Sequence, residues 1–199
     1  METVVRRRLG RQAAISISPY MPRALGSSLG LAAADCSWKF DFVYVASGDK
    51  HKNHGNLLIA WRLLAEQGVK PSLALTVDAI NHPLVAEEIA KQTKIYSLNI
   101  INLGKVVSDD IPILYGASSA LIFPSKVESF GLPLIEASQI GLPVLAPELD
   151  YVRDVVEPIE TFDPESPTSI ARAVRRFLRN PDKPTPVGTV KDFLTEVFR

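Results

Sequence analysis

The sequence holds 199 residues, of which 46% are hydrophobic and 22% charged, and its basic and acidic side chains balance to a formal net charge of zero. This composition predicts one packed domain, alone or with an appendage, and it argues against nucleic acid or an anionic membrane as the main partner. A single cysteine, Cys36, excludes an internal disulfide, and no apolar run approaches the roughly 18 residues of a membrane helix, so we expect a soluble, cytoplasmic protein without a transmembrane segment.

The first 40 residues differ from the rest in charge and in pattern. They carry six basic and two acidic side chains, a net charge of +4, and they are rich in Ser, Ala and Gly without a sustained hydrophobic period. An Arg-rich, acid-poor start resembles a mitochondrial transit peptide. A disordered tail or the remnant of an upstream domain explains the same composition, and we favour that reading. We therefore predict an irregular or disordered extension over residues 1–39.

From residue 40 onward, strand-like and helical patterns alternate. Apolar runs predict strands at residues 42–46, 73–77, 100–104, 120–123, 144–146 and 161–162. Helical spacing predicts a first helix whose apolar side chains are Leu57, Leu58, Trp61, Leu64 and Ala65. Later helices are expected at residues 83–92, 111–117, 133–140 and 167–179, and residues 181–199 are expected to form a Pro-rich linker and a last helix.

Alternation of this kind builds a parallel sheet that is covered by helices on both faces. The sequence therefore predicts an α/β fold with a doubly wound, Rossmann-like parallel sheet, in one domain over residues 40–180. Ligands of such sheets bind at the carboxyl ends of the strands, and the loops after Val45 and Phe123 both lie at that edge. No G-x-G-x-x-G follows any strand, which disfavours a dinucleotide-dependent dehydrogenase.

The loop after residues 120–123 has the features of an anion site. Gly131 tolerates a sharp backbone turn, and Pro133 suits the first position of a helix, where its missing N–H has no partner to lose. The unpaired N–H groups of that helix start are expected to point into the crevice at the sheet edge. Such groups can hold a phosphate or another anion.

Two carboxylates bracket this turn, Glu128 before it and Glu136 about one helical turn inside the helix. Ser125 and Glu128 have the spacing of a capping box, in which the glutamate only closes a helix start. Glu136 lies among apolar neighbours, where an acid is usually paired or hydrogen-bonded. For Glu128 alone, a helix-capping role and a functional role have equal support. The complete motif favours a functional role.

The motif resembles the signature of the retaining GT-B glycosyltransferases, the large group 1 or family 4 type. Glu128 and Glu136 are separated by seven residues with Phe-Gly-Leu-Pro at 130–133 inside, and Gly-Leu-Pro-Val-Leu-Ala follows at 141–146. Leu-Tyr-Gly-Ala-Ser at 114–118 and Phe-Pro-Ser at 123–125 resemble the family upstream. The resemblance runs from about residue 42 to residue 178. It implies the C-terminal, donor-binding half of a GT-B fold.

In this family the C-terminal half of the GT-B fold binds a nucleoside-diphosphate sugar, and the enzyme transfers a hexose with retention of configuration. The resemblance implies that Lys52 grips the diphosphate and that Glu128 holds hydroxyls of the sugar, which makes these two the candidate catalytic residues. It also implies that Glu136 binds the ribose. Further donor contacts are expected at Phe130, Gly131, Leu132, Ser47 and Gly48. One departure is that related enzymes often carry an arginine where Ala46 or Ser47 stands here.

We expect neither a metal nor a cofactor. His51 and His54 form a weak metal pattern because no carboxylate or cysteine ligand accompanies them, and the Asp-x-Asp handle of the other glycosyltransferase fold is absent from the sequence. The expected partners are the nucleotide-sugar donor, an unknown acceptor and a separate N-terminal acceptor-binding GT-B half, since residues 1–40 are too few for such a domain. A non-catalytic sugar-nucleotide-binding module and a GT-B-type NDP-sugar epimerase remain alternatives.

Overall fold

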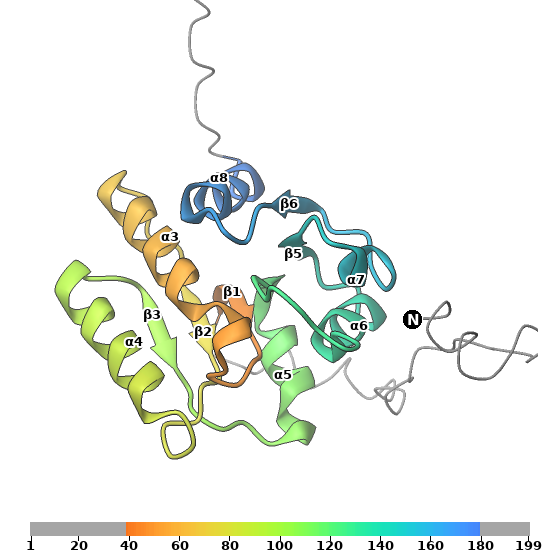
Figure 1. Ribbon diagram of the computed structural model, residues 1–199, viewed down its shortest axis with the longest axis horizontal. Helices are drawn as coiled ribbons and strands as arrows, with labels where there is room; N and C mark the ends of the chain where they lie inside the picture. Colours follow the sequence, from red (N-terminus) through yellow and green to blue (C-terminus); the bar gives the residue numbers. More distant parts are fainter. Residues whose placement is uncertain (1–38, 180–199) are drawn as a thin grey trace, which may run out of the picture.

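The computed structural model describes residues 39–179, which form an α/β domain around one parallel sheet (Figure 1). The predicted linker and helix at residues 181–199 lie outside the described residues, as does the predicted N-terminal extension apart from Lys39. Residues 40–179 of the predicted domain lie within the described part of the chain, and the boundaries of the domain stay a prediction. A doubly wound parallel sheet was the prediction, and the structure confirms it.

The sheet has six strands in the order β3-β2-β1-β4-β5-β6, and every neighbouring pair is parallel. The strands are β1 (Phe40–Tyr44), β2 (Leu73–Leu75), β3 (Ile100–Asn102), β4 (Ser118–Ile122), β5 (Val144–Pro147) and β6 (Glu160–Phe162). Strands β2 and β3 follow one another on one side of β1, and strands β4, β5 and β6 follow one another on its other side. The reversal therefore lies between β1 and β4, which is where open parallel sheets place their ligand crevice.

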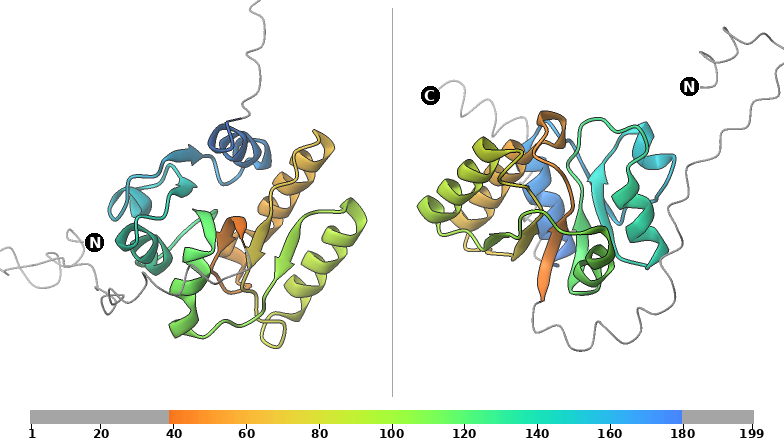
Figure 2. Two further views of the ribbon diagram at one scale, coloured as in Figure 1. Left: turned by 180° about the vertical axis from the view of Figure 1, so that it is seen from behind. Right: turned by 90° about the horizontal axis from the view of Figure 1, so that it is seen from below.

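In the described residues, six helices and two short 3₁₀ turns connect the strands or follow the last of them. They are η1 (Lys50–Lys52), α3 (His54–Glu66), α4 (Pro83–Tyr96), η2 (Ser108–Asp110), α5 (Ile111–Gly116), α6 (Leu132–Gln139), α7 (Asp150–Arg153) and α8 (Pro167–Phe177). Helices α3, α4 and α8 cover one face of the sheet, and α5 and α6 lie on the other (Figure 2). Between residues 39 and 179, no helix is both long and apolar enough to cross a membrane.

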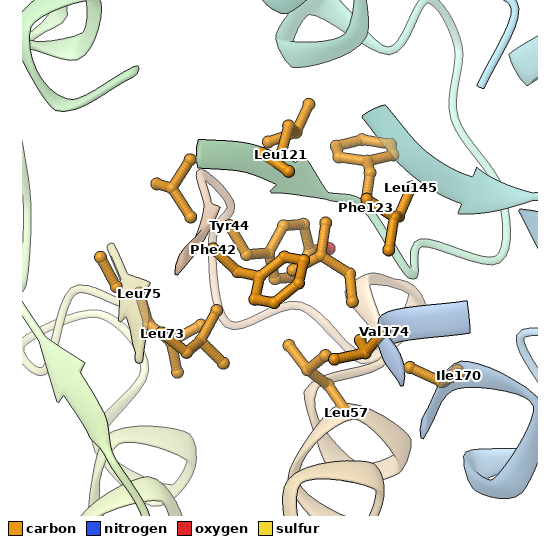
Figure 3. Close-up of a cluster of buried hydrophobic side chains, with 14 of the residues drawn as sticks. Phe42, Tyr44, Leu57, Leu73, Leu75, Leu121, Phe123, Leu145, Ile170 and Val174 are labelled. Carbon is orange, nitrogen blue, oxygen red and sulfur yellow. The ribbon is translucent and has the colours of Figure 1, made fainter. Parts of the chain in front are cut away.

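The main core lies between the sheet and helices α3 and α8 (Figure 3). Phe42 of β1 meets Trp61 of α3 edge-on at 5.6 Å between ring centroids, and it meets Phe177 of α8 at 5.4 Å. The indole N–H of Trp61 donates to the Pro71 carbonyl at 3.0 Å, so this large side chain is buried without an unpaired donor. Full burial of such aromatic side chains contributes about 1.5–3 kcal/mol each. The core fixes β1, and with it the loop that follows.

Four strands end earlier than their apolar runs suggested, and at two of these ends side chains replace the ladder bonds. The predicted strand at 73–77 stops at Leu75, since the Val77 N–H donates to the Asn102 side chain at 3.0 Å. The run at 42–46 stops at Tyr44, since the Ala46 N–H donates to Thr76 Oγ1 at 3.0 Å. These turns open the carboxyl edge of the sheet. The short helix α7 had no counterpart in the sequence prediction.

Candidate functional site

The two loops that carry the candidate residues meet at the carboxyl edge of the sheet. β1 and β4 are parallel neighbours, with Phe42 opposite Ala120 and Val43 opposite Leu121. Because parallel neighbours end at the same edge, the loop after β1 and the loop after β4 leave the sheet side by side. The prediction that both loops lie at this edge is confirmed.

Lys52 and Glu128 form an ion pair across these loops. Lys52 Nζ lies 2.6 Å from Glu128 Oε1, and the side chains are only 17% and 11% exposed. Ser125 Oγ, which is fully buried, donates to the same carboxylate oxygen at 2.5 Å. The capping-box interpretation of Ser125 and Glu128 is wrong, because no helix starts there and α6 begins only at Leu132. The serine instead orients the glutamate toward the lysine.

Hydrogen bonds to backbone carbonyls also join the two loops and hold the loop of Lys52 to β1. The His51 carbonyl accepts from the Lys126 N–H at 2.9 Å and from Ser125 Oγ at 3.3 Å. The hydroxyl of Tyr44, at the end of β1, donates to the Lys52 carbonyl at 2.8 Å. Burial, aided by the Glu128 carboxylate, raises the pKa of Tyr44 well above its usual value, so this donor keeps its proton.

The start of α6 lies directly after Glu128 in the chain. Gly131 is its N-cap, with φ 64° and ψ 50°, and no side chain caps the helix. Pro133 occupies the second helical position, one later than predicted, which is still among the first four N–H positions that lack a helical partner. Phe130 and Leu132 flank the turn and are 47% and 40% exposed. The expected turn is therefore present and accessible, and its binding of an anion stays a prediction.

Glu136 faces α5 through a hydrogen bond. Its Oε2 accepts from the Tyr115 hydroxyl at 2.9 Å, and the residue is half-buried. Burial raises the pKa of Glu136, and the Tyr115 hydrogen bond offsets part of that rise. The prediction that this acid is hydrogen-bonded is confirmed, whereas its role toward a ribose stays a prediction.

The raised pKa of Glu136 predicts a pH-dependent contribution to stability. The folded state holds the Glu136 proton more tightly than the unfolded state, so this contribution is full below the ordinary glutamate pKa and is lost as pH rises through the folded value. We expect Glu136→Gln to become more stable relative to the wild type between pH 4 and pH 7. Melting temperatures of both proteins across this range test it. A difference that does not change with pH would contradict the prediction.

Ser47 and Gly48 lie in the loop after β1, as predicted, but they are tied to the protein in different ways. The Ser47 hydroxyl donates to Asp49 at 2.6 Å, and its carbonyl meets His54 Nε2 at 2.8 Å. Gly48 is buried against the start of α4, where a Cβ would lie 2.4 Å from His82 Cβ. Gly48 thus allows the loop to approach α4 closely, and its contact with a donor stays a prediction.

We expect Gly48→Ala to destabilise the domain by about 1–3 kcal/mol, as overpacking a tight site does. The added methyl group can be accommodated only if the loop or His82 moves, and His82 Cβ is fixed to the backbone. Gly55→Ala is the matched control, because a Cβ added at this position of α3 would meet no atom within 4 Å outside its own helix turn. That change should be neutral or stabilising by up to about 1 kcal/mol. Chemical denaturation measures the free energy of unfolding of both variants. Equal changes in Gly48→Ala and Gly55→Ala would refute the packing argument.

The histidines of this region have structural contacts. His54 is buried, and burial lowers its pKa, so its neutral ring can donate Nε2–H to the Ser47 carbonyl. Among residues 39–179, no group of three or more His, Cys, Asp or Glu side chains is arranged to hold a metal. That donor binding needs no metal stays a prediction.

A pocket of about 310 Å³ opens at the same edge beside Ser47. Thr76, Asp78 and His82 line it from the connection between β2 and α4, and Lys105 lines it from the connection after β3. Sequence reasoning singled out none of these four residues. A signal was available for three of them, since Asp78 and Lys105 directly follow predicted strands and His82 directly precedes a predicted helix, whereas Thr76 lay inside a predicted strand.

Comparisons with known proteins agree with this arrangement. The family model for glycosyl transferases group 1 matches residues 37–189, which include every described residue. The serotype-specific mannosyltransferase WbdA of Escherichia coli is 30% identical over 181 residues, which is 89% of this chain and 22% of that protein. The chain thus spans under a quarter of this relative's length.

Two solved structures share the fold. The C-terminal domain of a glycosyl transferase group 1 family protein (LpcC) from Francisella tularensis has a TM-score of 0.62 and 18% identity, covering 77% of this chain and 84% of that one. Anabaena Alr3699/HepE in complex with UDP and glucose has a TM-score of 0.60 and 22% identity, covering 71% and 39%. From the family match and the shared parallel sheet together, we conclude that this chain belongs to the glycosyl transferases group 1 and has the fold of their C-terminal GT-B domain.

Proposed function

We propose that this domain binds a nucleoside-diphosphate sugar and is the donor-binding half of a retaining hexosyltransferase. The observation that carries the proposal is the Lys52–Glu128 pair, which lies at the strand-order reversal directly before the uncapped start of α6. A cation and the N–H groups around Phe130 to Leu132 suit a diphosphate, and a carboxylate held beside them suits sugar hydroxyls. The similarity to a mannosyltransferase and to a protein solved with UDP and glucose supports this class of donor.

Each group then has a distinct task in the reaction. Glycosyl transfer builds negative charge on the leaving diphosphate while the sugar becomes oxocarbenium-like. We assign the stabilisation of that charge to Lys52 and to the N–H groups at the start of α6, since fixed donors aimed at developing charge lower the barrier. Glu128 orients the sugar through its hydroxyls, and Glu136 holds the ribose. The pocket beside Ser47 has room for the base.

The partner that we propose is an acceptor-binding GT-B half facing the carboxyl edge. Of the ten exposed large hydrophobic side chains in the described region, four lie in loops at that edge and two lie in the first turns of the helices that follow. The four are Ile80, Val107, Val127 and Phe130, and the two are Leu84 and Leu132. Exposed apolar groups gathered in this way mark a surface that another unit covers. The single cysteine of the sequence favours a reducing compartment, and we propose that the enzyme works in the cytoplasm.

A thermal-shift screen tests donor binding. GDP or UDP should raise the melting temperature, because a ligand that binds only the folded state stabilises it, and a chelator should leave the shift unchanged because no metal takes part. Inosine and cytidine diphosphates and the plain nucleosides serve as comparisons. No shift with any nucleoside diphosphate at millimolar concentration would refute the proposal. A shift abolished by the chelator would refute only its metal-independent part.

A further inference from the structure

We propose that Asn53 is a positioning residue that holds Lys52 against Glu128, through its left-handed backbone and its side-chain amide. The inference rests on the proposed diphosphate-binding role of Lys52. It concerns the single residue between Lys52 and α3.

The backbone of Asn53 has a conformation that few side chains adopt. Its φ is 62° and its ψ 32°, and it joins η1 to α3. Asparagine tolerates this left-handed region better than other residues with a Cβ. Because the chain reverses its local handedness at Asn53, this residue sets how η1, which carries Lys52, is oriented relative to α3.

The amide of Asn53 ties three connections of the sheet together. Its Nδ2 donates to the Pro124 carbonyl at 3.1 Å and to the Pro164 carbonyl at 2.8 Å, so both amide protons are used. Pro124 begins the loop that carries Glu128, and Pro164 lies between β6 and α8. Asn53 is only 6% exposed, so these bonds are shielded from competing water.

Lys52 is thereby fixed on both sides. Its own carbonyl accepts from Tyr44, and the next residue is bound to the loop of Glu128. The Lys52 ammonium is then held 2.6 Å from the Glu128 carboxylate. A charge held in place before the ligand arrives contributes more to binding and catalysis than one that must be ordered.

Asn56 provides a matched control within the same helix. Its Nδ2 also donates to the Pro164 carbonyl at 2.8 Å, and its link to α8 therefore resembles one of the two links of Asn53. Asn56 has an ordinary helical backbone within α3 and is three residues farther from Lys52. Asn56→Ala thus removes a tie of α3 to the β6–α8 loop and leaves both the left-handed backbone and the Pro124 tie in place.

Two variants remove the amide of Asn53 while a left-handed backbone stays accessible at this position. Asn53→Gly keeps the left-handed conformation and removes the amide, whereas Asn53→Asp keeps the size and places an acceptor against two carbonyls. For each, the affinity ratio between a nucleoside diphosphate (GDP or UDP) and its nucleoside is measured by calorimetry. We expect both variants to lower this ratio at least fivefold, and Asn56→Ala to leave it unchanged. A ratio unchanged in folded Asn53→Gly, or lowered equally in Asn56→Ala, would overturn the proposal.

A second readout needs no ligand. The rate at which acetic anhydride modifies Lys52 is compared by mass spectrometry with that of Lys91, which is 61% exposed. Loss of positioning should free Lys52 from Glu128 and raise its relative rate at least threefold in Asn53→Gly. An unchanged rate would overturn the inference even if Asn53→Asp fails to fold. A wild type that binds no nucleoside diphosphate would instead refute the proposed function, while the acetylation rates still decide the role of Asn53.

Discussion

Residues 1–199 alone should bind donor yet transfer sugar negligibly, and transfer should appear when an N-terminal GT-B half is supplied in trans or fused ahead of Phe40. The described residues form one sheet whose carboxyl edge exposes Phe130 and Leu132 beside the ion pair. Positioning of an acceptor can lower a barrier by about 7–11 kcal/mol, which is five to eight powers of ten in rate. A facing half would supply that positioning and exclude water.

Acceptor-dependent formation of glycosylated product, followed by mass spectrometry with and without the added half, measures this effect. Glu128→Gln in the reconstituted enzyme is the control, because it should lose transfer while the two halves still associate. Fast transfer by the chain alone would contradict the account and would place the acceptor on this domain. Interconversion of the donor sugar without any acceptor would support the epimerase alternative instead.

Replacement of Lys52 by alanine should weaken nucleoside-diphosphate binding ten-fold or more and leave nucleoside binding nearly unchanged. A hydrogen bond to a charged group contributes about 1.5–3 kcal/mol, and a plain nucleoside has no phosphate for Lys52 to contact. The variant also leaves Glu128, 11% exposed, with Ser125 as its remaining side-chain partner. Some loss of stability is therefore expected, and titrations should be made well below the melting temperature of the variant.

Lys126→Ala is the matched control for this experiment. Lys126 Nζ pairs with Glu165 at the same 2.6 Å, in the neighbouring loop, with side chains that are 34% and 67% exposed. Exposed pairs contribute little, so this change should alter neither affinity. Isothermal titration calorimetry measures the affinities of the wild type, Lys52→Ala and Lys126→Ala for GDP, UDP and their nucleosides. Equal losses for diphosphate and nucleoside in Lys52→Ala would show that the lysine supports the fold rather than the phosphate.

The fold was predictable because the spacing of apolar residues along the sequence differs between strands and helices. Apolar runs marked the strands, and the face formed by Leu57, Trp61 and Leu64 marked α3, whose side chains are buried as expected. Errors occurred at strand ends, where the Thr76 and Asn102 side chains take the place of ladder bonds. Such replacements depend on the neighbouring strand and leave no periodic trace in the sequence.

The candidate site was predictable at the level of its loops. That Lys52 meets Glu128 depends on the pairing of β1 with β4, which brings together residues 76 positions apart. The family resemblance singled out both residues but not their contact. The bond of Asn53 to the neighbouring loop depends on tertiary distances, and no local spacing indicates it. The spacing of Ser125 and Glu128 indicated a contact between them, but as a helix cap and not as a support for an ion pair.

The structure of the domain with a nucleoside diphosphate bound tests the central claim most directly. A crystal grown with GDP or UDP, whichever gives the larger thermal shift, should place phosphate oxygens within hydrogen-bond distance of Lys52 Nζ and of the N–H groups at the start of α6. The ribose should lie near Glu136, and the base should occupy the pocket beside Ser47. A nucleotide bound elsewhere, with Lys52 and Glu128 still paired and untouched by phosphate, would contradict the account.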